Sequence, residues 1–451
     1  KTVNKNEPVN TETHFAIGSI TKSFTPVALA MLVDEGKINW DDKVVKYLPS
    51  FELYDEYVTN AFTIRDLLTH RSGLKSVSGG TLFYHSDFSR DEIIAGMKYL
   101  KPESGFRTKA AYQNIMFVVA AKIVEVVTED TWEGFIRSRI FSPLNMTRTI
   151  ILEAERNKST NISTPHIKNQ ELEVIPIKQE KLDNVGPAGS IYSTSTDMAQ
   201  YMMFILNKGI VHGDTLVKPD TFKEILKPQS HFPMYNDIHN EFTSYGFGWF
   251  LTPVNGHKII EHSGGVDGAT ANVMMIEDTK FGVVVLNNAA NWTPFKISFD
   301  LIGNQIKDEG YIGAGVWMAN NATLRDSMAQ VKHQKFIESQ IKKTKPSLPL
   351  TEYTGTYKDQ MYGNVVIELK NDELKMVFEH TELFSGNLSH WHYNTFRLWD
   401  RDPRIVDGLI TFEFNSSGGI IGFNIDQPNL LDVDFSEVKF NKASITLPKP
   451  H

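Results

Sequence analysis

Apolar residues recur every three or four positions through much of the first part of the chain, and this spacing predicts helices. One helix is expected over residues 20–35. Two more are expected over residues 115–127 and 198–206, which Asn114 and Thr194 can cap. Together these segments predict a helical lobe.

Further along, the pattern changes to the short apolar runs typical of strands. Residues 258–262, 269–276 and 282–287 read as three consecutive strands, with 277–280 as the turn between the last two. A helical pattern returns over residues 295–309. Strands with helices on both sides in the sequence predict an α/β layer beside the helical lobe.

The last part of the chain has a different character. Residues 323–345 are charged and helical in pattern, so we expect a linker there. Beyond them the chain is almost entirely β in pattern, and short strands recur about every ten residues. The expected strands are 355–357, 365–369, 374–378, 395–399, 409–414, 420–425 and 434–440. This rhythm predicts a small closed barrel of roughly 100 residues.

Composition narrows the function classes. The chain has 451 residues, a net charge of −8 and no Lys/Arg-rich block, which argues against nucleic acid as a partner. No apolar run is long enough to span a bilayer. Cysteine is absent, which excludes disulfides, thiol catalysis and Cys-bound metals. Strand alternation would bring His390 and His392 onto one face, but one such pair makes a weak metal site, so we expect neither metal nor cofactor.

A serine and a lysine three residues apart carry the first chemical signal. Ser-x-x-Lys occurs four times, starting at Ser19, Ser72, Ser339 and Ser436. Only Ser19 follows a strand-like run and enters an amphipathic helix, where backbone N–H groups favour developing negative charge. A lysine one turn away can help to remove the serine proton, which a serine nucleophile needs. We therefore expect Ser19 and Lys22 to act together.

A proline lies inside the same expected helix. Pro26 has no N–H, so it would leave the Lys22 carbonyl without its helical donor, at a cost of up to ~3 kcal/mol unless it lies near the first turn. A tolerated kink is one interpretation. A bend that sets the geometry of Lys22 is the other.

Two further segments offer chemistry at suitable positions. Tyr112-Gln113-Asn114 supplies a phenol that can exchange a proton and an amide that can hold a carbonyl. Tyr362 and Asn364 repeat this spacing, but in an expected hairpin turn, which is the ordinary context of such a pair.

The third segment is His262-Ser263-Gly264-Gly265, at the end of an expected strand. Gly265 can bring a backbone N–H close to a substrate oxygen. A histidine in such a place is, taken alone, more often part of a turn than catalytic.

In order and spacing, these segments resemble the serine β-lactamase and penicillin-binding protein superfamily, in its class C-like, D-aminopeptidase and esterase branch. Residues 67–74, 187–194 and 245–249 look like the family as well, and the resemblance covers about residues 1–320. Residues 353–357 and 393–396 look like the lipocalin-like domain that some members append.

The resemblance implies an α/β, β-lactamase-like fold: an antiparallel sheet flanked by helices, a helical lobe, and then a small all-β lipocalin-like barrel. We expect a hydrolase domain over residues 1–322, a helical linker over 323–348 and the barrel over 349–451. Members usually carry two strands before the nucleophile, and only 18 residues precede Ser19, so we expect those N-terminal strands to be missing.

The resemblance also implies residue roles. Ser19 is the acylated nucleophile, Lys22 and Tyr112 share the proton transfers, and Asn114 orients the substrate. His262 takes the place of the usual lysine, so binding of a substrate carboxylate should weaken as this histidine deprotonates near pH ~6.5.

The remaining residues of that strand end are expected to bind substrate. They are Ser263, Gly264 and Gly265, and the N–H groups of Ser19 and Gly265 would form the oxyanion hole.

The implied function is hydrolysis of an amide or ester in a small molecule or peptide: a D-residue peptidase or amidase, an esterase or a β-lactamase. Because His262 replaces the usual lysine, β-lactams are the less expected substrates. The alternative is an inert binding protein whose barrel holds a ligand or partner. The family also favours a periplasmic or secreted location and is compatible with a homo-oligomer.

Overall fold

The computed structural model describes residues 1–169, 171–232, 242–399, 401–427, 430 and 432–443. Two compact units divide the chain. The first contains residues 1–77 and 101–327, and the second contains residues 78–100 and 328–451. Residues 78–100, which lie within the expected hydrolase domain, therefore group with the C-terminal part of the chain.

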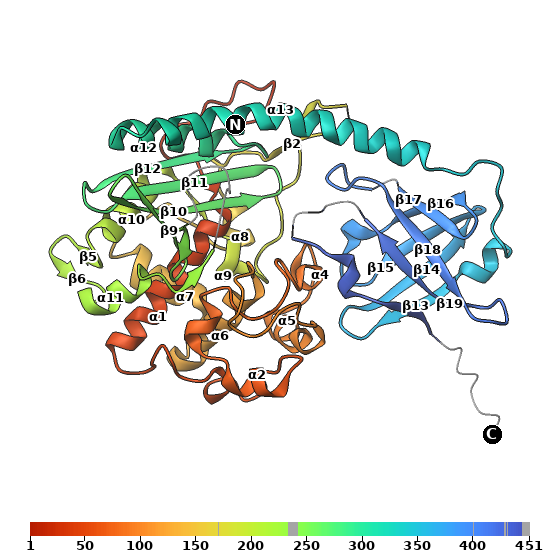
Figure 1. Cartoon of the computed structure of the whole chain (residues 1–451), viewed down its shortest axis with the longest axis horizontal. Coiled ribbons are helices and arrows are strands. Elements are labelled where there is room, and N and C mark those ends of the chain that lie inside the picture. Colours follow the sequence, from red (N-terminus) through yellow and green to blue (C-terminus); the bar gives the residue numbers. More distant parts are fainter. Residues whose placement is uncertain (170, 233–241, 400, 428–429, 431, 444–451) are drawn as a thin grey trace. The chain divides into compact units, whose positions relative to one another are not determined.

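A six-stranded antiparallel sheet forms one layer of the first unit, in the order β12-β11-β10-β9-β8-β7 (Figure 1). Its strands are β7 (Ser230–His231), β8 (Ser244–Tyr245), β9 (Phe250–Val254), β10 (His257–Val266), β11 (Ala269–Ile276) and β12 (Phe281–Asn287). The last three contain the predicted strands, but β10 continues to Val266, so residues 262–265 lie within it and not at its end. One face of the sheet packs on helix α12 (Thr293–Ile306), in a core cluster that includes Ile259, Met274 and Phe299.

Helices make up most of the rest of this unit. They are α1 (Phe24–Asp34), α2 (Glu56–Ala61), α3 (Ile64–Leu67), α6 (Ile115–Thr128), α7 (Trp132–Ile136), α8 (Glu153–Arg156), α9 (Gly186–Gly189), α10 (Ser195–Leu206) and α11 (Pro219–Ile225). The Thr194 side chain caps α10 as predicted, accepting a hydrogen bond from the Asp197 N–H (3.1 Å). Short strand pairs complete the unit: β1 (Phe15–Ala16) with β4 (Tyr192–Ser193), β2 (His166–Lys168) with β3 (Val174–Pro176), and β5 (Ile210–Val211) with β6 (Asp214–Thr215).

Helix α13 (Glu309–Glu338) leads from the first unit into the second. None of the helices among the described residues combines the length and the apolar character that a bilayer span requires.

The second unit is built around a closed barrel of eight antiparallel strands. They are β13 (Gly355–Asp359), β14 (Gly363–Lys370), β15 (Glu373–Phe378), β16 (Gly386–His392), β17 (Thr395–Trp399), β18 (Gly408–Phe414), β19 (Ile420–Asp426) and β20 (Phe440–Lys442). Inside, aromatic rings pack on one another, as in Tyr353 against Phe412 (centroids 4.8 Å apart) and Phe423 against Phe440 (5.2 Å). An eight-stranded barrel is just wide enough for such side chains to fill.

Two details of the barrel differ from the sequence prediction. Strand β16 was not predicted, because its polar and histidine residues hide the alternation. It carries His390 and His392, which lie on either side of a β-bulge. His390 forms a hydrogen bond with the Tyr393 carbonyl (3.0 Å), and His392 accepts one from the Ile341 N–H (3.4 Å). The predicted strand 434–440 is mostly a 3₁₀ turn, η7 (Phe435–Glu437), and becomes a strand only at Phe440.

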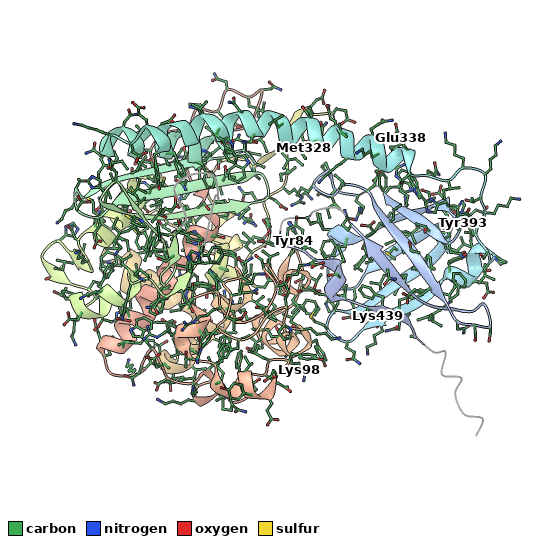
Figure 2. The ribbon with its side chains drawn as sticks, in the orientation of Figure 1. Tyr84, Lys98, Met328, Glu338, Tyr393 and Lys439 are labelled. Carbon is green, nitrogen blue, oxygen red and sulfur yellow. The ribbon has the colours of Figure 1, made fainter. Side chains whose placement is uncertain are left out.

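Residues 78–100 pack on this barrel through helices α4 (Gly80–Phe83) and α5 (Arg90–Gly96) and the residues around them. Phe88 stacks on His380 (centroids 3.9 Å apart), and the Asp87 N–H donates to the His380 carbonyl (3.1 Å). The Gly79 N–H donates to the Glu437 carboxylate (2.8 Å). Figure 2 labels Tyr84 and Lys98 in this segment and Lys439 in the barrel.

Candidate active site

The chain places Ser19 and Lys22 on a six-residue 3₁₀ helix, η1 (Gly18–Ser23), and not on the α-helix that was predicted to start at Ile20. A 3₁₀ helix has three residues per turn, so side chains at i and i+3 lie directly above one another. Lys22 Nζ accordingly donates to Ser19 Oγ at 3.0 Å. The Ser19 side chain remains partly exposed, whereas Lys22 is fully buried.

Pro26 explains where the α-helix begins. Helix α1 starts at Phe24, so Pro26 falls in its first turn, where backbone N–H groups lack intrahelical partners in any case. The proline therefore costs little. It also fits the change from 3₁₀ to α geometry just after Lys22.

Oxygen atoms and aromatic rings surround the Lys22 ammonium group. Besides Ser19, Nζ donates to Asn114 Oδ1 (2.6 Å) and to the Ala188 carbonyl (2.9 Å). It lies 4.7 Å from the centroid of the Tyr112 ring, within the range of a cation–π interaction. The role of a backbone carbonyl cannot be predicted from residue identity, so only the family resemblance of residues 187–194 points to Ala188.

Asn114 and Tyr112 lie on the segment that leads into α6. The prediction that Asn114 caps this helix is wrong: its side chain makes no capping bond and accepts from Lys22 instead. The main chain of Tyr112 is tied to the preceding loop, since its carbonyl accepts from the Val77 N–H (2.7 Å).

Strand β10 passes directly against the start of η1. A Cβ added to Gly264 would lie 1.8 Å from the Ile17 carbonyl oxygen, and one added to Gly18 would lie 2.7 Å from the Gly265 nitrogen. Only glycine allows two backbones to approach this closely. Ser263 is partly exposed on the same strand, and Gly265 is exposed with open space beside its Cα.

His262 is buried on β10 and takes part in a chain of hydrogen bonds. Its Nδ1–H donates to the Ser263 carbonyl (2.6 Å), so Nε2 accepts from the Tyr245 hydroxyl (3.2 Å). Desolvation, with the nearby charge of Lys22, lowers the pKa of His262 to about 3. The expectation that His262 titrates near pH 6.5 is therefore wrong, because that value holds for a solvated imidazole.

Two aromatic residues near the site had no predicted role. Tyr245 donates to His262, and burial holds the pKa of its phenol well above the ordinary value. His70 lies 4.4 Å from the ring centroids of both Tyr112 and Tyr245. Both belong to stretches that were singled out as family-like, and this was the only signal that could have found them.

The other motif matches lie in different surroundings. Lys75, Lys342 and Lys439, the lysines of the three competing Ser-x-x-Lys matches, are exposed, in contrast to buried Lys22. Tyr362 is buried in the turn between β13 and β14, as expected of a hairpin residue.

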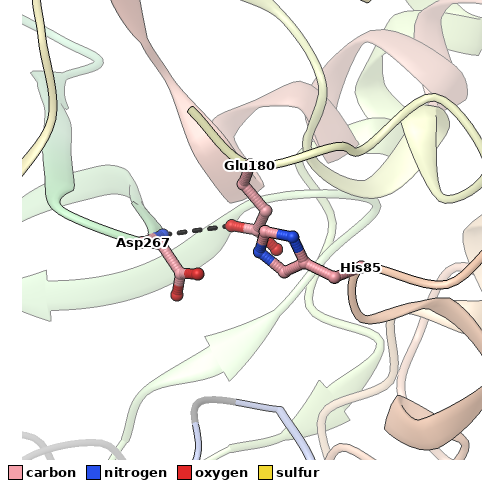
Figure 3. A group of neighbouring side chains, drawn as sticks. All are labelled: His85, Glu180 and Asp267. Atoms are coloured by element: carbon pink, nitrogen blue, oxygen red, sulfur yellow. Dashed lines mark hydrogen bonds between the residues drawn. The ribbon is translucent and has the colours of Figure 1, made fainter. Parts of the chain in front are cut away.

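A buried carboxylate supports the far end of β10. The Asp267 N–H, in the turn to β11, donates to Glu180 Oε2 at 3.0 Å (Figure 3). Glu180 itself lies on the loop that precedes α9, the helix that supplies the Ala188 carbonyl. The loop that contains Glu180 thus bonds to the turn after β10 and leads into α9.

Comparison with known families gives two matches along the chain. Residues 1–304 match the family described as beta-lactamase. Residues 339–442 match a domain of unknown function (DUF3471), a range that contains all eight barrel strands.

The curated relatives have low sequence identity to this chain but align with much of its length. An unguisins hydrolase of Aspergillus campestris is 26% identical over 392 residues, which cover 83% of this chain and 72% of that protein. Penicillin-binding protein 4* of Bacillus subtilis is 26% identical over 314 residues, covering 64% of each protein. The chain therefore spans less than two thirds of the Bacillus protein.

Solved structures agree on the fold. The octameric penicillin-binding protein homologue from Pyrococcus abyssi aligns with a TM-score of 0.60 over 96% of this chain and 90% of its own, at 20% identity. A D-stereospecific amidohydrolase from Streptomyces aligns with a TM-score of 0.52 over 61% of this chain and 82% of its own, at 23% identity.

Proposed function

This chain belongs to the beta-lactamase family of serine hydrolases, and from that premise we propose that it cleaves amide or ester bonds through an acyl-enzyme on Ser19. The observation that carries the proposal is the contact between Lys22 Nζ and Ser19 Oγ, 3.0 Å long, with the lysine buried and the serine partly exposed. A buried amine beside a reachable hydroxyl is the arrangement that activates a serine nucleophile.

In the proposed reaction, Ser19 Oγ attacks the substrate carbonyl and its proton passes to the pair formed by Lys22 and Tyr112. Lys22 Nζ, which donates to Ser19 Oγ at 3.0 Å, lies 4.7 Å from the centroid of the Tyr112 ring, so it is next to both the serine and the tyrosine. The tetrahedral oxyanion is held by the N–H groups of Ser19 and Gly265. Tyr112 then returns the proton to the leaving nitrogen or oxygen as the carbonyl bond to that atom breaks. Water hydrolyses the resulting ester.

The charge of the site favours certain substrates. His262 stands where the family usually has a lysine, and with a pKa of about 3 it is neutral at physiological pH. A neutral imidazole gives a free substrate carboxylate no ion pair. Amides, esters and peptides without a required terminal carboxylate are therefore the better substrates. The name of the D-stereospecific amidohydrolase supports the choice of amides, including those of D-residues.

Labelling tests the proposal directly. Wild-type protein should react covalently with a fluorescent fluorophosphonate or a fluorescent penicillin, and Ser19→Ala should react with neither. A panel of nitrophenyl esters, D-amino-acid anilides and a chromogenic cephalosporin would then rank the substrates. If neither reagent labels the wild type, the inert binding protein is the better description.

For the barrel we propose a packing or assembly role, because aromatic rings pack through its interior. The octameric state of the Pyrococcus abyssi homologue supports self-association. Light scattering on the intact chain should give the mass of an oligomer, at least twice the 51.1 kDa of one chain. A monomer at micromolar concentration would contradict this proposal.

A further inference from the structure

His70 lies in the turn after α3 and is buried, with 1% of its surface exposed. Its backbone has φ 56°, in the left-handed region, which non-glycine residues seldom adopt although histidine is among those that do so more often. A buried histidine calls for a physical reason, and its neighbours supply one.

Two hydrogen bonds connect His70 to the peptides on either side of Tyr112. The Ala111 N–H donates to the His70 carbonyl (2.7 Å), and the Gln113 N–H donates to His70 Nδ1 (3.0 Å). Residues 111 and 113 are thus both fixed by one residue. Because Tyr112 lies between these two residues, His70 also fixes the main-chain position of Tyr112.

The imidazole ring also contacts the Tyr112 side chain. The two ring centroids are 4.4 Å apart, with the planes tilted by 35°. Tyr245, the donor to His262, lies at the same centroid distance from His70. One ring therefore packs against the proposed proton carrier and against the residue that orients His262.

The protonation state of His70 is defined by this arrangement. Because Nδ1 accepts from Gln113, the ring proton lies on Nε2, and this atom has no hydrogen-bond partner among the described residues. Desolvation, Lys22 and His262 together hold the pKa of His70 well below its ordinary value. The ring is a neutral acceptor. An ordinary core residue at this position would be apolar and would leave no unsatisfied N–H.

We propose that His70 is a positioning residue for Tyr112: its carbonyl and Nδ1 fix the peptides around Tyr112, and its ring face sets the orientation of the phenol. This inference rests on the proposed role of Tyr112 in proton transfer. It assigns His70 no contact with the substrate.

Kinetics of ester hydrolysis test the proposal. His70→Leu, which keeps a side chain of similar size but loses the acceptor and the ring, should lower kcat about 100-fold, as expected for a small misplacement of a catalytic group, with KM within threefold. His70→Asn tolerates a positive φ and offers an oxygen to the Gln113 N–H, so it should recover at least a tenth of the wild-type kcat. Leu68→Ala, a buried control in the same turn, should lower the Tm without lowering kcat of the folded protein.

A readout that needs no activity separates this inference from the proposed function. In protein with ¹³C-labelled tyrosine rings, the Tyr112 resonance, assigned with Tyr112→Phe, should differ between His70→Leu and His70→Asn, which both lack the imidazole ring current, because only asparagine still offers an acceptor to the Gln113 N–H. Equal resonances in the two variants, or equal loss of kcat, overturn the positioning role. If fluorophosphonate fails to label the wild type, the proposed function falls, while the resonance still decides the role of His70.

Discussion

At the scale of single residues, burial sets the charge of neighbouring side chains on β10. Glu261 and His262 are adjacent on this strand, so they point to opposite faces of the sheet. His262 faces Tyr245 near the candidate site, and desolvation keeps it neutral. Desolvation also raises the pKa of Glu261 to about 7. Burial thus favours the uncharged form of each side chain, the free base of His262 and the acid of Glu261.

Glu261 should make the folded state less stable as the pH rises. Its carboxyl binds its proton more tightly in the folded state, so its contribution is complete below pH 4.5 and is lost as the pH passes 7. Glu261→Gln removes this dependence. From pH 5 to pH 8, the free energy of unfolding of the variant should therefore rise by roughly 2–3 kcal/mol relative to that of the wild type.

Urea unfolding at the two pH values measures the difference, and Glu103→Gln, at an exposed position, is the control. If the free energy of unfolding changes equally with pH in wild type and in Glu261→Gln, Glu261 is already ionised in the folded protein at pH 5.

The neutral state of His262 makes a kinetic prediction. Between pH 5 and pH 8 the imidazole does not titrate, since its pKa is about 3. His262→Asn should therefore change the rate of Ser19 acylation without changing the shape of its pH profile. The measurement is the rate of fluorophosphonate labelling across this range. A midpoint near pH 6.5 in the wild type that vanishes in His262→Asn would contradict the buried, neutral histidine.

The sequence predicted which residue types meet but not their charge states. Ser19 and Lys22 are three positions apart, so their proximity follows from local geometry in either kind of helix. The pKa of His262 depends on burial and on Lys22, which is 240 positions away in the chain. No local pattern contains that information.

At the scale of elements, the contact between β10 and η1 brings two distant segments together. Their backbones touch where Gly264 meets Ile17 and Gly18. The sequence predicted both elements, and the beginning of the helical region differs only in being a 3₁₀ helix. The closeness of the two backbones could be read only from the structure, because glycine also serves in turns.

Gly264→Ala tests this contact. The added methyl group would lie 1.8 Å from the Ile17 carbonyl oxygen, so β10 and η1 must separate. We expect a loss of stability of roughly 3 kcal/mol or more, together with loss of Ser19 labelling. Gly265→Ala, with open space around the new carbon, should keep the Tm within about 2 °C, since its surface cost is within ±0.5 kcal/mol. Equal Tm values for the two variants would contradict the close approach.

At the scale of the whole molecule, the second unit is assembled from two separate stretches of sequence. Periodicity predicted the barrel strands, because each strand is a local pattern. Periodicity could not predict that residues 78–100 pack on these strands. The local sequence around Phe88 and Tyr84 does not indicate that they contact His380 and Phe384.

Deleting the barrel should therefore damage more than the barrel. Without residues 346–451, the buried side chains of Tyr84 and Phe88 lose the rings of Phe384 and His380 that pack against them. We expect the shortened protein to bind the dye ANS and to aggregate. The same deletion with residues 78–100 replaced by a flexible Gly-Ser linker of about ten residues should stay soluble. Equal solubility of the two proteins, measured by light scattering, would show that segment 78–100 needs no partner.

The split composition of the second unit has a consequence for synthesis on the ribosome. Residues 78–100 emerge ~340 residues before Lys442, the end of the last barrel strand, which at 5–20 residues per second is a delay of roughly 17–70 s. During that interval the apolar side chains of the early segment are synthesised but not yet covered. The nascent chain thus presents a transient binding site for chaperones in the middle of its hydrolase sequence, and this site closes only when the barrel has been completed.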